Sequence, residues 1–175
     1  PISFSCSGQS WNPSFRKLSM PAGCGRMIFV TVGSTDFDAL IVRMDELAPR
    51  LGDKVVMQIG LGEHAPRHAQ FFRFAPSLDR YYDQADIIVA HGGMGTIAEA
   101  LEREKKLICV VNPATYDRHQ EHLLRILAER NHLLWCKDLE RLEDALRQAR
   151  TAQFDRYQPP ECHIHEVIAE YLGTA

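Results

Sequence analysis

The stretch "DIIVAHGGMGTIAEALEREKK" (residues 86–106) decides the fold, because its character changes twice along its length. A short apolar run ends at His91, a glycine-rich turn follows, and a helix-forming sequence continues from there. A strand, a turn and a helix in this order place free backbone N–H groups at the helix start, where an anion can bind. The glycines can adopt positive φ angles and let a ligand approach the backbone closely. The stretch therefore predicts an anion site in the turn.

Outward from this stretch, apolar runs typical of buried strands alternate with segments whose apolar residues recur every three or four positions. Strands are predicted at "MIFVTV" (27–32), "KVVMQI" (54–59), "FFRFA" (71–75), "DIIVA" (86–90), "KLICVV" (106–111) and "HLLWC" (132–136). Helices are predicted at 37–51, at 77–84, from the glycine turn to residue 105, and at 123–130, 139–149 and 164–172. Thr35 or Asp36 is expected to cap the first helix, and Asp138 the fifth. The alternation predicts an α/β fold, a Rossmann-like doubly wound parallel sheet of about six strands.

The composition is that of an ordinary globular protein, with 45% hydrophobic and 25% charged residues among 175. A net charge of −3 argues against a basic surface for nucleic acid or an anionic membrane. The apolar runs are far shorter than the roughly 20 residues that cross a bilayer. Five scattered cysteines without a CxxC pair argue against a disulfide framework and a structural zinc site. We therefore expect a cytoplasmic protein in which Cys109 and Cys136 pack as small apolar side chains.

Residues 1–26 differ from the rest of the chain. They are rich in Ser, Gly and Pro, show no periodicity and lack the sustained apolar segment of a signal peptide. We expect them to be a poorly ordered arm or a leader of vector or upstream origin, with Met27 as the natural start. Residues 27–175 are then expected to form one domain that ends in a helix.

Three loops with unusual residues follow predicted strands: "VGST" (32–35), "HGGMGT" (91–96) and "NPATYDRHQ" (112–120). Because the carboxyl ends of parallel strands share one edge of a sheet, these loops are expected to form one composite pocket. Thr96 offers a hydroxyl donor, Glu99 can accept both hydroxyls of a ribose, and Gln120 can reach the pocket from the third loop. Structural alternatives stay open: a turn built only for close packing, and a solvent-facing glutamate like Glu102.

The sequence lacks several other functional motifs. The turn is neither GxGxxG nor a P-loop, since no Lys-Ser/Thr follows its last glycine. His119 with His122, and Cys162 with His163 and His165, lack the further ligands of a metal site. No Ser-His-Asp or Cys-His set is discernible, and neither a cofactor nor a metal is expected.

Three segments in order, "MIFVTVGSTDFDALI" (27–41), "DIIVAHGGMGTIAEALEREKKLICVV" (86–111) and "DRHQEHLLRILAERNHLLWC" (117–136), resemble the C-terminal domain of glycosyltransferase family 28. The resemblance points to free-standing, single-domain members. These include the donor-binding subunit of the dolichyl-diphosphate N-acetylglucosamine transferase and bacterial exopolysaccharide glycosyltransferase subunits. It implies the C-terminal half of a GT-B glycosyltransferase, which binds a UDP-sugar, with the acceptor half on a separate, membrane-anchored chain.

By position, the resemblance implies that the diphosphate and nearby donor atoms are held by Gly33, Ser34, Thr35, His91, Gly92, Gly93, Met94, Gly95 and Thr96. It implies that Glu99 binds the uridine ribose, and that the sugar or the ribose is contacted by Asp117, His119 and Gln120. His91 is then a donor-site ligand, and the general base comes from the partner chain. "HGGMG" replaces the commoner "HAGAG", and Arg118 stands where Asp or Asn is common, so the donated sugar stays open.

The implied function is the UDP-sugar-binding subunit of an inverting glycosyltransferase. It would transfer a hexose or N-acetylhexosamine to a polyprenyl-diphosphate-linked acceptor in polysaccharide biosynthesis. A membrane-anchored acceptor-binding subunit would dock on an exposed apolar patch and hold the chain at the cytoplasmic face of the membrane. Two alternatives remain: a non-catalytic accessory subunit that enhances a partner glycosyltransferase, and a small nucleotide-sensing domain.

Overall fold

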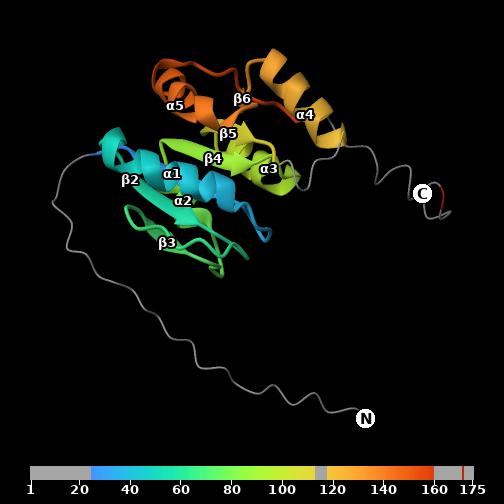
Figure 1. The fold of residues 1–175 in the computed structure, drawn as a ribbon. Helices are drawn as coiled ribbons and strands as arrows, with labels where there is room; N and C mark the ends of the chain where they lie inside the picture. The colour runs from blue at the N-terminus through green and yellow to red at the C-terminus, as the bar shows by residue number, and fades with distance from the viewer. Residues whose placement is uncertain (1–24, 113–117, 160–170, 172–175) are drawn as a thin grey trace, which may run out of the picture.

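Six parallel strands form one sheet in the order β3-β2-β1-β4-β5-β6 in the computed structural model, which describes residues 25–112, 118–159 and 171. The strands are β1 (Met27–Thr31), β2 (Lys54–Gln58), β3 (Gln70–Phe72), β4 (Ile87–His91), β5 (Lys106–Val110) and β6 (Leu134–Cys136). The helices are α1 (Asp38–Leu51), α2 (Asp79–Gln84), α3 (Met94–Glu102), α4 (Arg118–Glu129), the short 3-10 helix η2 (Leu139–Arg141) and α5 (Leu142–Thr151). This strand order is that of a doubly wound Rossmann-like sheet and confirms the predicted α/β fold (Figure 1).

Helices cover both faces of the sheet (Figure 1). α1 and α5 bury apolar stripes on one face, with Leu40 and Leu146 among them. On the other face, α2, α3 and α4 bury side chains that include Tyr82 and Leu124. Every residue of β1 is buried, because its side chains alternate between these two cores. Burial on both faces explains the unbroken apolar runs of the sequence.

The predicted elements that fall in the described residues are confirmed, with differences of a few residues at their ends. These ends depend on local backbone geometry. α3 ends at Glu102 rather than at residue 105, because Glu104 adopts a φ of 54° and turns the chain into β5. Asp138 caps η2 as predicted, since its carboxylate accepts the N–H of Glu140 at 3.0 Å. The helix predicted at 164–172 and the arm at 1–26 lie almost wholly outside the described residues.

The cap predicted for the first helix is wrong. Phe37 is the N-cap of α1, and no side chain caps the helix there. The Thr35 hydroxyl instead donates to the carbonyl oxygen of Val32 at 2.8 Å, which closes the turn after β1. The carboxylate of Asp38 accepts two N–H groups from the loop after β2, so the first turn of the helix anchors a neighbouring segment.

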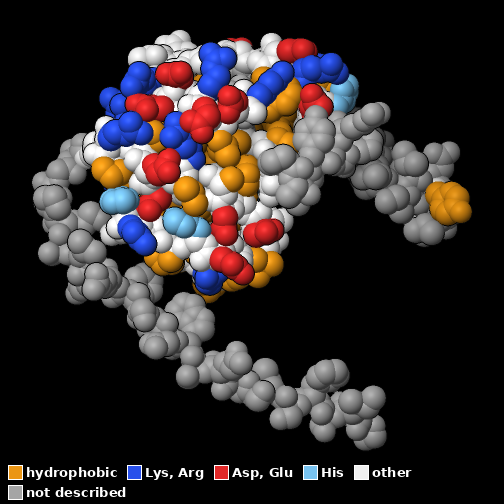
Figure 2. Space-filling model, viewed as in Figure 1, with side chains coloured by type: hydrophobic (Ala, Val, Ile, Leu, Met, Phe, Trp, Pro, Cys, Tyr) orange, Lys and Arg blue, Asp and Glu red, His pale blue; other side chains and the backbone are white. Residues whose placement is uncertain are grey.

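Acidic and basic side chains are interspersed on the face formed by α1 and α5 (Figure 2). Arg43 pairs with Glu46 and Arg147 with Glu143, and mixed charges of this kind create no patch of a single sign. Within the described ranges, none of the helices has the length and apolarity that crossing a bilayer demands. Cys109 and Cys136 are free and buried, as predicted.

Candidate functional site

The candidate site lies where the chain order reverses in the middle of the sheet. From β1, the chain continues outward through β2 and β3, and β4 then returns to the other side of β1. The loop after β1 leads to α1 on one face, and the loop after β4 leads to α3 on the other. Diverging loops at such a switch point leave a crevice at the carboxyl ends of the strands, where sheets of this type bind ligands.

The ring of His91, at the end of β4, fills the space between these two loops. A Cβ atom at Gly33 would lie 2.9 Å from Cε1 of His91, and one at Gly93 would lie 2.5 Å from its Nε2. Both distances are too short for a side chain, and Gly33 also has a φ of 63°. The two loops are therefore in contact through one histidine, as their shared sheet edge predicts.

The environment of His91 favours its neutral form. Burial lowers the pKa of the imidazole, because the charged form loses its hydration. The Thr31 backbone opposes part of this shift, yet the buried Nδ1 forms no hydrogen bond of standard geometry among the described residues. At neutral pH the ring is thus an uncharged group wedged between two glycines.

The glycines of the β4 loop serve packing and access rather than positive φ angles. Gly33, Gly52 and Gly60 are the glycines with positive φ in the described residues, so the glycines of the "HGGMGT" turn do not use the positive φ angles that glycine permits. A Cβ at Gly92 would lie 3.0 Å from Cδ1 of Leu124, whereas one at Gly95 would meet no atom of the described residues within 4 Å. Gly92 therefore allows α4 to pack closely, and Gly95 leaves the helix start open to a ligand.

Free donors face this opening at the start of α3. Gly93 is the N-cap and has no side chain to cap the helix, and the first helical bond runs from Ile97 N–H to Gly93 oxygen at 3.0 Å. The N–H groups of Met94, Gly95 and Thr96 precede that bond and have no acceptor within the helix. Together with the positive end of the helix dipole they suit an anion.

A buried polar pair holds the β1 loop in its conformation. Gln58 Nε2 donates to the carbonyl oxygen of Gly33 at 2.6 Å, and the Thr31 hydroxyl hydrogen-bonds to Gln58 Oε1. Thr31 in turn accepts the N–H of Gly33 at 3.2 Å. Sequence reasoning missed this pair, although a glutamine inside the apolar run "KVVMQI" was the available signal. Ser34 is exposed at the tip of the loop, so its hydroxyl is accessible.

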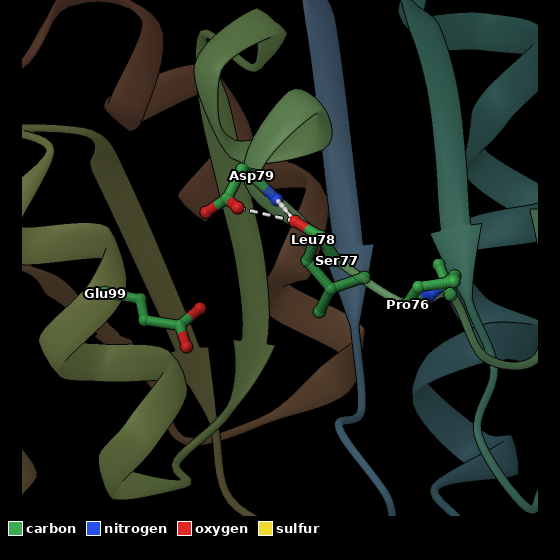
Figure 3. A pocket seen from close by; sticks show the side chains of 6 residues that line it. Pro76, Ser77, Leu78, Asp79 and Glu99 are labelled. Carbon is green, nitrogen blue, oxygen red and sulfur yellow. Dashed lines mark hydrogen bonds between the residues drawn. The ribbon is translucent and has the colours of Figure 1, made fainter.

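Glu99 lines a hollow of about 360 Å³ that the sequence did not predict. The hollow lies between α3 and the loop from β3 to α2, and its other lining residues are Ala75, Pro76, Ser77, Leu78 and Asp79. The carboxylates of Glu99 and Asp79 approach it from the two helices (Figure 3). Loop 75–78 follows a short predicted strand and carries no glycine motif, so nothing in the sequence singled it out.

Thr96 and Glu99 both lie beside the hydroxyl of Tyr82, a residue of α2 that is 1% exposed. Burial is the main reason that the pKa of Tyr82 is raised to about 12, and the negative charge of Glu99 adds to the shift. The Thr96 hydroxyl is therefore engaged with α2, and the predicted ribose ligand Glu99 has a buried phenol as its neighbour.

The third loop is described only in part. Asn112 at its start is buried and donates to the Asp36 carbonyl oxygen at 2.9 Å, which joins this loop to the β1 loop. Asp117 lies outside the described residues, and of His119 only the backbone, in the first turn of α4, is described. Gln120 is half-buried in the same turn. In the described part of the chain, no three His, Cys, Asp or Glu side chains gather closely enough to hold a metal ion.

Comparisons with known proteins agree with this architecture. The chain is 35% identical over 121 residues to the UDP-N-acetylglucosamine transferase subunit ALG13 of Mus musculus, a match that covers 62% of this chain and 10% of the relative. It thus spans about a tenth of that relative's length. A crystal structure of the glycotransferase of kitacinnamycin superposes with a TM-score of 0.61 at 22% identity, covering 82% of this chain and 40% of the other.

An NMR structure of ALG13 superposes with a TM-score of 0.55 at 18% identity, covering 82% of this chain and 94% of the other. At these identities the structural matches show the fold alone, a Rossmann-like domain of the GT-B glycosyltransferase type. Residues 27–171 match the glycosyltransferase family 28 C-terminal domain, so that the chain belongs to this family.

Proposed function

We propose that this chain binds the UDP-sugar donor of an inverting glycosyltransferase that transfers a hexose or N-acetylhexosamine. Family membership and the name of the mammalian relative, a UDP-N-acetylglucosamine transferase subunit, support a transferase that uses this class of donor. Among hexosamines, the same name favours N-acetylglucosamine. No metal or cofactor takes part in this proposal.

The observation that carries the proposal is the position of Glu99 relative to the start of α3. Glu99 lies one helical turn behind Gly95, and it lines the hollow between α3 and loop 75–78. A ribose diol can donate two hydrogen bonds to such a carboxylate while the diphosphate receives the free N–H groups at the helix start. The hollow would then hold the uridine against loop 75–78.

The chemistry expected at this site is stabilisation of the leaving group. UDP departs with additional negative charge on its diphosphate, and donors already aimed at that position lower the barrier. His91 is poorly suited to be the base, because its ring is wedged between Gly33 and Gly93. We assign it to donor binding together with Ser34 and Thr35, and we assign the base to the acceptor-binding partner.

The partner proposed is a membrane-anchored subunit that presents a polyprenyl-diphosphate-linked acceptor at the cytoplasmic face of the membrane. The word "subunit" in the name of the mammalian relative supports a partner chain. Leu61, Phe74 and Met94 are large apolar side chains that are 66%, 50% and 66% exposed. They follow the ends of β2, β3 and β4, so they belong to the sheet edge that carries the site. Apolar side chains exposed at one edge are suited to docking.

Isothermal titration calorimetry with UDP tests the donor assignment. Glu99→Ala is expected to weaken UDP binding about tenfold or more, the loss of two hydrogen bonds to a charged group. Glu102→Ala is the matched control, because Glu102 is an exposed glutamate of the same helix that does not line the hollow. No UDP binding by the wild-type chain, or equal binding by Glu99→Ala, would contradict the proposal.

Thermal shift with UDP-N-acetylglucosamine, UDP-glucuronate and UDP-glucose would then rank the donors, since binding to the native state alone raises the melting temperature. Transfer assays with the partner subunit separate the donor subunit from an accessory one. An accessory subunit would keep full activity in the Glu99→Ala variant, whereas the donor subunit would lose it.

A further inference from the structure

The wall of the hollow opposite Glu99 is fastened to the C-terminal end of α3 by the side chain of Arg103. Its guanidinium pairs with the Asp79 carboxylate and lies 3.7 Å, Nε to Oδ1, from Asp83. Nη1 donates to the backbone oxygen of Glu99 at 3.2 Å. The guanidinium carbon also lies 5.2 Å from the ring centroid of Tyr82, in cation–π contact. Arg103 therefore contacts three residues of α2 and one of α3.

The contacts of Arg103 differ from those of an ordinary surface ion pair. Its side chain is 29% exposed, and four partners hold the planar guanidinium in one position. Isolated surface pairs contribute little, whereas a network with fixed geometry contributes more. Ser77 extends the network, because its hydroxyl interacts with the Asp79 carboxylate (Figure 3).

We propose that Arg103 is a positioning residue for the donor nucleoside: it ties the Ser77–Asp79 wall to α3 and so sets the width of the hollow in front of Glu99. The inference rests on the proposed function, in which this hollow holds the uridine. Arg103 does not line the hollow and acts only through its two walls. Tyr82 completes the arrangement, because its buried hydroxyl lies beside the Glu99 side chain that the ribose would meet.

The positive charge of Arg103 is expected to favour UDP binding, as its position between the two helices does. Asp79, Asp83 and Glu99 place three carboxylates around the hollow and α2, and Arg103 lies against the first two. Without the guanidinium, these carboxylates would repel an anionic ligand more strongly. Loss of Arg103 is thus expected to weaken UDP binding through a displaced wall and through charge.

A double-mutant cycle with Glu99 tests the positioning role, with UDP affinity measured by calorimetry. Arg103→Gln is expected to weaken UDP binding roughly tenfold in the wild-type background and only about threefold in the Glu99→Ala background, because the wall acts through Glu99 whereas the effect of charge persists without it. Arg103→Lys should recover part of the affinity, since it keeps the charge without the planar fork. Asp79→Asn, an exposed and mild change, should also lower the affinity, but by less, because it removes one of the carboxylates that repel the anion.

Arg147→Gln is the control for the loss of an arginine charge, because Arg147 forms an ordinary surface pair with Glu143 on α5, away from the hollow. It should leave UDP affinity unchanged. The positioning role is overturned, and the proposed function stands, if the wild type binds UDP and Arg103→Gln binds it equally well. The same conclusion follows if Arg103→Gln lowers UDP affinity by the same factor with Glu99 present and with Glu99→Ala. If the wild type does not bind UDP, the proposed function and the positioning role are both overturned.

Discussion

At the scale of single residues, the two glycines that begin α3 have opposite requirements. A Cβ at Gly93 would lie 2.5 Å from the His91 ring, whereas a Cβ at Gly95 would have no neighbour within 4 Å in the part of the chain that the structure describes. Both glycines belong to the motif that predicted the site, and the motif alone does not separate these two roles. The two roles differ because the ring of His91, at the end of β4, lies against Gly93. The spacing of glycines in the sequence does not indicate such a contact.

This difference predicts a variant that is more stable but binds less. Gly95→Ala should raise the free energy of unfolding by about 0.5–1 kcal/mol, because alanine is the better helix former and meets no atom there. The added methyl group occupies the space at the open helix start, so UDP affinity should fall severalfold. Chemical denaturation and calorimetry measure the two effects.

Gly93→Ala is the contrasting variant, and it should be destabilised because the His91 ring must move. Unchanged UDP affinity in Gly95→Ala would mean that no ligand approaches the backbone at this position.

At the scale of elements, the segment between β2 and β3 replaces the helix that usually connects parallel strands. This segment is held by two carboxylates of α1, which are seven positions apart in the sequence and therefore lie on one side of the helix. Asp38 accepts the N–H groups of Glu63 and His64, and Asp45 accepts those of Arg67 and His68 at 2.8 and 2.7 Å. The crossover is thus fixed by backbone hydrogen bonds rather than by an apolar stripe.

The strands predicted at 54–59 and 71–75 left a connection without a helix between them, but the sequence did not reveal its anchoring. Strands such as β1 and β5 were predictable, because unbroken β-branched and apolar runs fit a sheet that is buried on both faces. In contrast, Asp38 and Asp45 look like ordinary acidic residues of a surface helix. Their role depends on which segment packs beside α1, and this is a property of the tertiary fold.

Asp45 is 5% exposed, so its removal has a predictable cost. Asp45→Ala should lower the free energy of unfolding by about 2 kcal/mol, since two backbone donors lose a charged acceptor. Asp45→Asn should lose less, because one acceptor oxygen remains. Glu46→Ala is the control, because this neighbour is 58% exposed and its pair with Arg43 should contribute about 0.5 kcal/mol or less. Urea denaturation compares the three variants, and an equal cost for Asp45→Ala and Glu46→Ala would refute the anchoring.

At the scale of the whole molecule, the sequence predicted the doubly wound sheet and the edge on which the site lies. It singled out the β1 and β4 loops of the candidate site, which glycines mark. It did not locate loop 75–78 or Arg103, since short polar segments carry no periodic signal. Spacing alone did not separate Glu99 from Glu102, and the family resemblance selected it as the ribose ligand. Its place on the hollow is a structural difference between the two glutamates.

His91 connects the two halves of the sheet, because its ring joins the β1 loop to the β4 loop across the switch point. Burial lowers the pKa of this imidazole below its usual value of 6.5, so the unfolded chain takes up the proton more readily than the native one. The stabilising contribution is therefore fully present above about pH 6.5 and is lost as the pH falls toward the lowered pKa. The slope from this one group is at most about 1.4 kcal/mol per pH unit.

The free energy of unfolding, measured by denaturation between pH 7.5 and 5, should fall more steeply for the wild type than for His91→Asn. The variant should be less stable at pH 7.5, because the smaller side chain leaves the space between Gly33 and Gly93 unfilled. His64, His68 and His132 are present in both proteins, so the difference between the two slopes isolates His91. Parallel curves would show that the protonation of His91 is not coupled to folding, and that its ring reaches water in the native protein.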